Sequence, residues 1–252
     1  MSHFVISVIT TPNSPDVDEL LAPYSEHLEV ESYIDASKSQ LINEGKDIQK
    51  HTKKRVETLL KEKPEYKPTE REEKILALTT DDDFHSYMTE GCEVDEDGNR
   101  LSSYNPNSKW DWYVVGGRWP DMLKLKDGTR ADEAQIKDID FSPDEQVFKD
   151  ALDFWDGYVL EQDPEKYENV FYKREYFLEN YTRKGYARQQ ATFYTRAVVT
   201  PDGQWHEVGQ MGWFGMSSES GHERTDWADK WYNRFIKNED PEATLTIIDC
   251  YI

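Results

Sequence analysis

One short segment combines residue types suited to holding a small anion. It runs from Asn105 to Trp119 and reads Asn-Pro-Asn-Ser-Lys-Trp-Asp-Trp-Tyr-Val-Val-Gly-Gly-Arg-Trp. Three of the chain's eight tryptophans fall here, with two adjacent glycines, a lysine and an arginine. Glycine lets a ligand approach the backbone, guanidinium groups bind phosphate or carboxylate, and indole rings stack on flat groups. The segment therefore predicts a pocket for an anionic ligand.

A second glycine-aromatic segment, Gly209 to Met216, reads Gly-Gln-Met-Gly-Trp-Phe-Gly-Met. If it folds beside the first, the two line one cleft. The predicted ligand-binding residues are Lys109, Trp110, Trp112, Gly116, Gly117, Arg118, Trp119 and Trp213. In this hypothesis the cations contact the anion, the glycines supply amides, and the indoles form stacking walls. The alternative is structural: a bulged strand whose Arg118 pairs with an acid, and a turn buried by aromatic side chains.

Catalytic and metal motifs have less support. Neither glycine segment has the spacing of a Walker loop or a dinucleotide fingerprint, and no His-Glu-x-x-His is present. An enzyme using Asp111, His206 or Asp249 as acid–base groups stays open. His3, His206 and Asp249 meet if the terminal strands pair, and the alternative is a chance polar edge. Whether the protein is an enzyme is undecided, and no cofactor or metal is predicted. Asp81 to Asp83 predict a helix cap, since calcium-loop spacing is missing.

The composition limits the possible partners. The chain has 252 residues, a formal net charge of −21 and 13% aromatic residues. Such a charge disfavours direct binding of nucleic acid, and no apolar run is long enough to cross a membrane. The two cysteines, Cys92 and Cys250, are expected to be free thiols of a cytoplasmic protein. The charge also supports an alternative function, an acidic inhibitor or adaptor that binds a host protein, possibly by nucleic-acid mimicry.

Hydrophobic periodicity and turn signals predict the elements that position these residues. Strands are expected at 3–10, 110–115, 122–126, 192–200, 204–208 and 244–252, and helices at 36–63, 69–78, 81–88, from 142 onward and at 226–236. Strand 110–115 should place Trp110 and Trp112 on one face and pair with 122–126. The fold class is α+β, with a mixed or mainly antiparallel sheet and packed helices. Residues 1–252 are expected to form a single domain with a charged helical insertion at about 36–90.

Four pieces of the sequence together resemble a known family. They are Met-Ser-His-Phe at the start with Leu21-Ala-Pro-Tyr24, the 105–119 segment, Arg130-Ala-Asp-x-Ala134 with Lys137-Asp-Ile-Asp-Phe141, and Gly203-x-Trp-x-Glu207 with Gly212-Trp-Phe-Gly215 and the closing Ile248-Asp-Cys-Tyr-Ile252. This pattern resembles a family of uncharacterised proteins of tailed bacteriophages and some prophages. The resemblance implies a phage origin and action in the cytoplasm of an infected bacterium. Relatives often close on Asp-Cys-His-Ile, and Tyr251 replaces that histidine here.

Overall fold

The chain folds into two compact units. A computed structural model describes residues 2–167, 170–210 and 217–252. The first unit contains the residues up to Leu28 and those from Pro106 onward, and the second is Glu29–Asn105. The expected insertion at about 36–90 lies inside the second unit. Helices and a mixed sheet are both present, which confirms the predicted α+β class.

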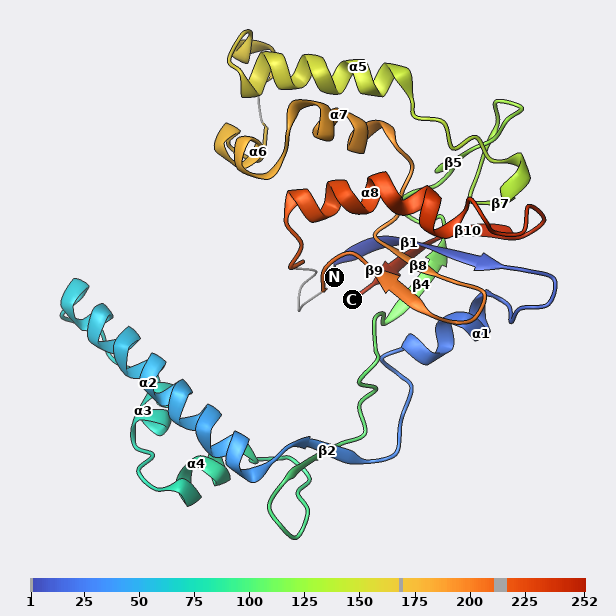
Figure 1. Ribbon diagram of the computed structural model, residues 1–252. Coiled ribbons are helices and arrows are strands. Elements are labelled where there is room, and N and C mark those ends of the chain that lie inside the picture. The colour runs from blue at the N-terminus through green and yellow to red at the C-terminus, as the bar shows by residue number, and fades with distance from the viewer. Residues whose placement is uncertain (1, 168–169, 211–216) are drawn as a thin grey trace. The chain divides into compact units, whose positions relative to one another are not determined.

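The first unit is built on one sheet whose central strands come from opposite ends of the sequence (Figure 1). Strand β1 runs antiparallel to β10 over its whole length and parallel to β8, and β9 closes the far edge. On its other side β10 pairs with β4 and β7. The bounds are β1 His3–Thr10, β4 Trp112–Val115, β7 Glu133–Gln135, β8 Ala197–Val199, β9 Trp205–Glu207 and β10 Thr244–Tyr251.

The sheet has an apolar core on each face. Because side chains alternate along a strand, β1 sends Ile6 and Val8 to one face and Ile9 to the other. Helix α1, Val17–Leu21, packs on the first face, and α8, Gly221–Phe235, covers the second (Figure 1). The α8 face buries Trp227, Trp231 and Phe235, whereas the fully buried residues of the α1 face are mainly aliphatic and Trp110, Tyr113 and Trp205 pack at its margin.

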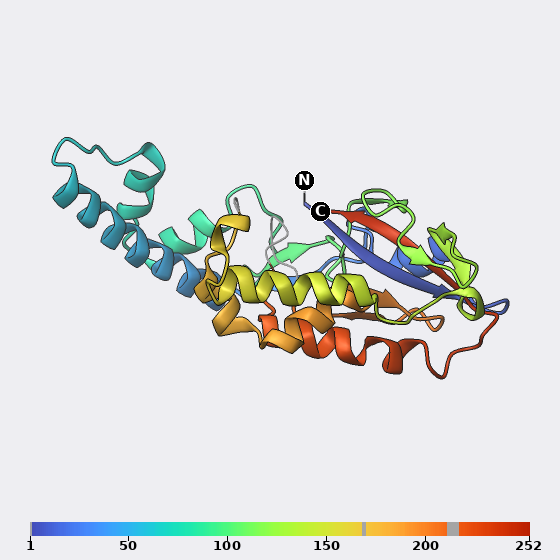
Figure 2. The same ribbon diagram turned by 90° about the horizontal axis from the view of Figure 1, so that it is seen from above.

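Further helices form a layer outside α8. Helix α7, Arg183–Ala191, contacts α8, and α5, Glu145–Phe154, packs on α7 (Figure 2). A π-helical segment, Trp155–Val159, continues α5, and α6, Arg174–Asn180, packs on it. Short 3-10 turns are Ala22–Tyr24, Ile136–Asp138 and Pro164–Lys166. The α5 start was predicted at Ser142, but the cap is Asp144, whose carboxylate accepts from two backbone amides.

The second unit is mainly helical. Its long helix α2, Lys38–Glu62, carries α3, Glu70–Leu76, and α4, Asp81–Met88, alongside it (Figure 2). Strands β2, Tyr33–Ala36, and β3, Arg100–Ser102, pair antiparallel. Capping boxes at Thr69 and Thr80 open α3 and α4. Asp81 to Asp83 therefore form the first turn of a helix as predicted, but the cap residue is Thr80, and of the three only Asp83 takes part in the capping box.

One predicted strand pairing was wrong. Residues 122–126 were expected to pair with 110–115, but β5, Leu123–Lys124, pairs with β6, Arg130–Ala131. Strand β4 pairs with β10 instead. The connection after β4 contains three residues with positive φ, Gly116, Gly117 and Asp121, and is irregular, so β5 pairs with the next strand β6. The chain-terminal strand was the better partner, although it lies far away in sequence.

Candidate functional site

The two adjacent glycines shape a tight turn at the end of β4. Both have positive φ, +72° at Gly116 and +56° at Gly117. A Cβ at Gly116 would lie 2.4 Å from a carboxylate oxygen of Asp132, and one at Gly117 would lie 2.4 Å from the Cβ of Asp249. Their amides already donate to the carbonyls of Ile247 and Val115, each at 2.9 Å. The expected role of these amides as donors to a ligand is therefore corrected: the glycines make room for two aspartates.

Asp249 is a fully buried carboxylate at the centre of this region. Its side chain has no exposed surface, and the backbone N–H of Arg118 donates to Oδ2 at 3.0 Å. His3 Nδ1 lies 3.1 Å from Oδ1 and 3.2 Å from Oδ2. A buried carboxylate needs such partners, because a charge removed from water is costly unless it is hydrogen-bonded. The pairing of β1 with β10 brings His3 and Asp249 together across 246 positions of sequence.

An aromatic stack adjoins the carboxylate. Trp112 is 43% exposed, and its ring stacks on Tyr251 with centroids 3.4 Å apart and planes at 20°. The ring of Tyr251 also contacts that of His3, with centroids 3.8 Å apart. Desolvation raises the pKa of the Tyr251 phenol, the charge of Asp249 raises that pKa further, and Arg118 lowers it.

Arg118 is an exposed residue. Within residues 2–167, 170–210 and 217–252, its guanidinium group forms no ion pair, although the chain has 51 acidic residues. The structural alternative predicted an ion pair between Arg118 and an acidic residue, and the described ranges contain no such pair. An exposed cation in the same segment as the exposed indole of Trp112 is suited to an anionic ring compound.

The other predicted binding residues divide between the two faces of the sheet. Lys109 donates to Glu207 at 2.8 Å, and Trp110 donates to the carbonyl of Leu21 at 3.2 Å. Trp110 packs edge-on against Tyr113 in the core under α1. The expectation that Trp110 and Trp112 share a face was wrong, because β4 begins only at Trp112 and the alternation does not reach Trp110.

Trp119 lies on the α8 side of the sheet, as does Trp112, which pairs with Tyr251 of β10. Trp119 packs against the core there, and its N–H donates to the carbonyl of Gly116 at 2.9 Å. Trp213 and most of the second glycine-aromatic segment lie outside the described residues. The candidate site is therefore defined as Arg118, Trp112, Tyr251, His3 and Asp249. The role of these residues in ligand binding stays a prediction.

The sequence had signalled part of this site. A meeting of His3, His206 and Asp249 was one of two alternatives for the terminal strands, and His3 and Asp249 do meet. His206, the third candidate of that group, instead accepts from Arg234 at 3.1 Å. Tyr251 was missed as a site residue, although it lies two positions beyond Asp249 and so on the same face of the strand. A histidine held by a buried carboxylate is also the arrangement that orients a general base.

One side-chain cluster could hold a metal ion. Glu26, His27 and Asp111 place ligand atoms within 4.8 Å of one another. His27 Nε2 already lies 2.8 Å from Asp111 Oδ1, and the side chain of His27 is 70% exposed. An exposed ion pair explains the cluster equally well. Cys92 and Cys250 are free, as predicted, one exposed and one buried, and burial raises the pKa of the Cys250 thiol.

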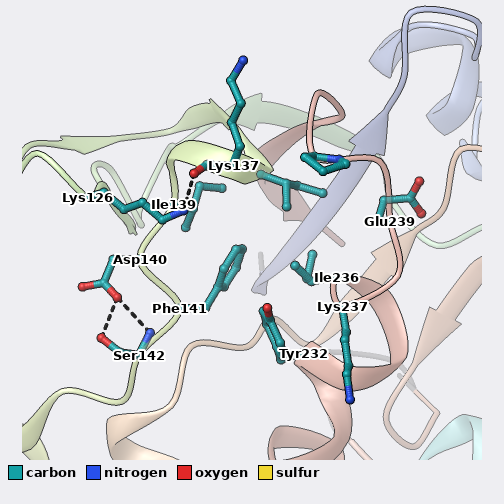
Figure 3. A pocket seen from close by; sticks show the side chains of 12 residues that line it. Lys126, Lys137, Ile139, Asp140, Phe141, Ser142, Tyr232, Ile236, Lys237 and Glu239 are labelled. Atoms are coloured by element: carbon teal, nitrogen blue, oxygen red, sulfur yellow. Dashed lines mark hydrogen bonds between the residues drawn. The ribbon is translucent and has the colours of Figure 1, made fainter.

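A cavity of about 570 Å³ lies beside the C-terminal end of α8 (Figure 3). Phe141 and Tyr232 point into it, with ring centroids 5.3 Å apart. Lys137 and Lys237 point away from it, and the ammonium group of Lys126 donates to the carbonyl of Lys137 (Figure 3). The hollow is therefore better suited to an apolar group than to an anion.

Comparison of the chain with protein-family models, with curated proteins and with solved structures finds no match. Among the described residues, no helix has the length and apolar character that a membrane span requires. The function must therefore be argued from the site itself.

Proposed function

We propose that this protein is a phage accessory protein that binds a small anionic ligand, such as a nucleotide or a related signal molecule. Arg118 contacts the phosphate or carboxylate, and the open face of Trp112 stacks on the ring of the ligand. His3, held by Asp249, supplies a further polar contact. The cytoplasm of the host bacterium is the proposed place of action.

The observation that carries this proposal is the state of Arg118. In a chain of net charge −21, an exposed guanidinium group forms no ion pair with any residue of the described ranges. The backbone N–H of Arg118 donates to buried Asp249, and Tyr251, two residues further along β10, stacks on Trp112. A fixed backbone, a free cation and an exposed indole are the elements of an anion site with a preference for flat ligands.

Isothermal titration with mono-, di- and cyclic nucleotides at constant ionic strength tests the proposal. We expect one of these nucleotides to bind. Arg118→Ala should lower the affinity for it roughly tenfold to a hundredfold, because a hydrogen bond to a charged group contributes about 1.5–3 kcal/mol. Arg71→Ala is the matched control, since Arg71 is an exposed arginine of helix α3 in the other unit.

The Trp112→Ala variant tests the contribution of the indole ring separately from that of the Arg118 guanidinium group. Loss of stacking should lower the affinity for nucleotides more than the affinity for inorganic phosphate, because only the nucleotide has a ring to stack. No binding of any nucleotide, or equal binding by the Arg118→Ala variant, would remove the basis of the proposal.

A further inference from the structure

Two carboxylates and an imidazole converge beside the start of β4. Glu26 and His27 come shortly after the 3-10 turn Ala22–Tyr24, and Asp111 directly precedes β4. Each of the three side chains offers a ligand atom, and these atoms lie within 4.8 Å of one another. All three residues lie in the first unit and none belongs to the Arg118 site, so an inference from this cluster does not depend on the function proposed above.

Backbone hydrogen bonds hold the two ligand-bearing segments side by side. Ser25 forms a parallel β-bridge with Trp110, and the N–H of Glu26 donates to the carbonyl of Trp110 at 2.9 Å. The N–H of Asp111 donates to the carbonyl of Tyr251 at 2.8 Å, which fixes that segment to β10. The backbone therefore places Glu26 and Asp111 next to each other whether or not an ion pair forms between the side chains of the cluster.

The second carboxylate separates a metal site from a simple ion pair. An ion pair and a metal ion account equally well for the contact of His27 with Asp111, at 2.8 Å. Glu26 is partly buried, and its carboxylate forms no hydrogen bond or ion pair with the residues that the structure describes. Lys109, two positions before Asp111, donates to Glu207 instead. Two carboxylates that share one imidazole repel each other unless a cation lies between them.

The types of the three ligand atoms favour a transition metal. Imidazole nitrogen binds zinc and its neighbours in the first transition row, whereas magnesium and calcium prefer oxygen ligands alone. Ligand atoms on one zinc ion lie about 2.1 Å from it and therefore about 3–4 Å from one another. The side chain of His27 is 70% exposed and that of Asp111 is 34% exposed, so both can rotate by the small amount that this spacing requires.

We propose that Glu26, His27 and Asp111 bind one divalent transition-metal ion, for which Zn²⁺ is the probe. The ligands are Nε2 of His27, the atom that faces Asp111, and one carboxylate oxygen of each acid. The ion replaces the ion pair of His27 with Asp111 and neutralises both carboxylates. Three protein ligands leave at least one coordination position for water, which is the composition of open zinc sites and not of closed structural ones.

Calorimetric titration of the metal-free full chain with Zn²⁺, Mg²⁺ and Ca²⁺ tests the proposal. Every sample carries Cys92→Ser, because the exposed thiol of Cys92 would bind zinc on its own. One zinc ion per chain is expected, with an affinity at least about tenfold higher than that for Mg²⁺ or Ca²⁺. His27→Gln should lower the zinc affinity at least about tenfold, since even residues that only orient a metal ligand contribute that much. His51→Gln is the matched control, because His51 is an exposed histidine of helix α2.

Glu26→Gln distinguishes the metal site from the ion pair. It leaves His27 in contact with Asp111 but removes one proposed ligand, and we expect it to lower the zinc affinity at least about tenfold. Thermal unfolding shows whether each variant is folded, and if His27→Gln or Glu26→Gln is not, the other decides. The proposal is overturned if no zinc ion binds stoichiometrically, if Mg²⁺ or Ca²⁺ binds as tightly as Zn²⁺, if a folded His27→Gln or Glu26→Gln chain binds zinc as its parent does, or if His51→Gln weakens zinc binding as strongly as His27→Gln.

Discussion

At the scale of single residues, the turn after β4 depends on Gly117 for two separate reasons. Its φ is +56°, and a Cβ there would meet the Cβ of Asp249 at 2.4 Å. Gly128 has φ of +88° but nothing within 4 Å of a Cβ. The two positions therefore separate the cost of a left-handed backbone from the cost of a steric collision.

We expect Gly117→Ala to lower the free energy of unfolding by at least about 2 kcal/mol, and Gly128→Ala by about 1 kcal/mol. Urea unfolding followed by tryptophan fluorescence gives both values. The Gly117 variant should also lose ligand affinity, since Asp249 must move and it anchors the N–H of Arg118. Equal losses in the two variants would show that the contact with Asp249 costs nothing.

The residues of the site were predictable only in part. The Trp-Gly-Arg segment pointed to Arg118 and Trp112 because their types are unusual together. Nothing local in the sequence showed that Asp249 and Asp132 fill the space over the two glycines, since those contacts come from β10 and the segment after β6. Lys109 was expected at the anion, but Glu207 pairs with it on the other face.

At the scale of elements, the helix caps were the most predictable features because they are encoded within four residues. Thr69-x-x-Glu72 forms a capping box and the Asp81–Asp83 run opens a helix, as predicted. The partner of β4 was not predictable in the same way. Strand pairing over more than a hundred positions leaves no local signature, so the nearer strand at 122–126 seemed the natural neighbour.

The cap of α4 gives an element-scale prediction with a defined pH dependence. Hydrogen bonds from the backbone N–H of Thr80, then from that of Thr79, lower the pKa of Asp83 to about 2. A lowered pKa in the folded state means that this carboxylate contributes stability above the ordinary pKa of aspartate. That contribution is lost as the pH falls from about 4 towards 2.

Asp83→Asn should therefore destabilise α4 at pH 6 and have progressively less effect as the pH approaches 2. Hydrogen exchange of the α4 amides at pH 6, 4 and 2 measures the difference between the variant and the unmodified chain. Asp82→Asn is the control, since Thr80 caps the helix through Asp83 and not through Asp82. A constant difference across this range would contradict the assignment.

At the scale of the whole molecule, the second unit enters and leaves the first at neighbouring points. The N–H of Glu26 donates to the carbonyl of Trp110 at 2.9 Å, and that of Lys109 donates to the carbonyl of Tyr24 at 2.7 Å. Both of these hydrogen bonds lie within the first unit, and the N–H of Val30 donates to the carbonyl of Ser103 within the second. The sheet and its helices do not need residues 29–105 to bring these ends together.

We therefore expect a shortened chain, in which a few glycine and serine residues replace 29–105, to fold and to bind the same ligand as the full chain. Cooperative thermal unfolding and unchanged affinity are the expected results. An unfolded shortened chain would show that the first unit requires the second for its stability. Loss of binding with the fold retained would place part of the site in residues 29–105.

The pairing of β1 with β10 also determines when the candidate site can form during synthesis of the chain. His3 leaves the ribosome 246 positions before its partner Asp249. Until then β1 lacks the neighbour that covers one of its edges, and contacts so distant in sequence form slowly. A nascent chain that ends before β10 has an incomplete sheet and lacks the contact between His3 and Asp249. We therefore expect a prematurely terminated chain to bind no ligand at this site.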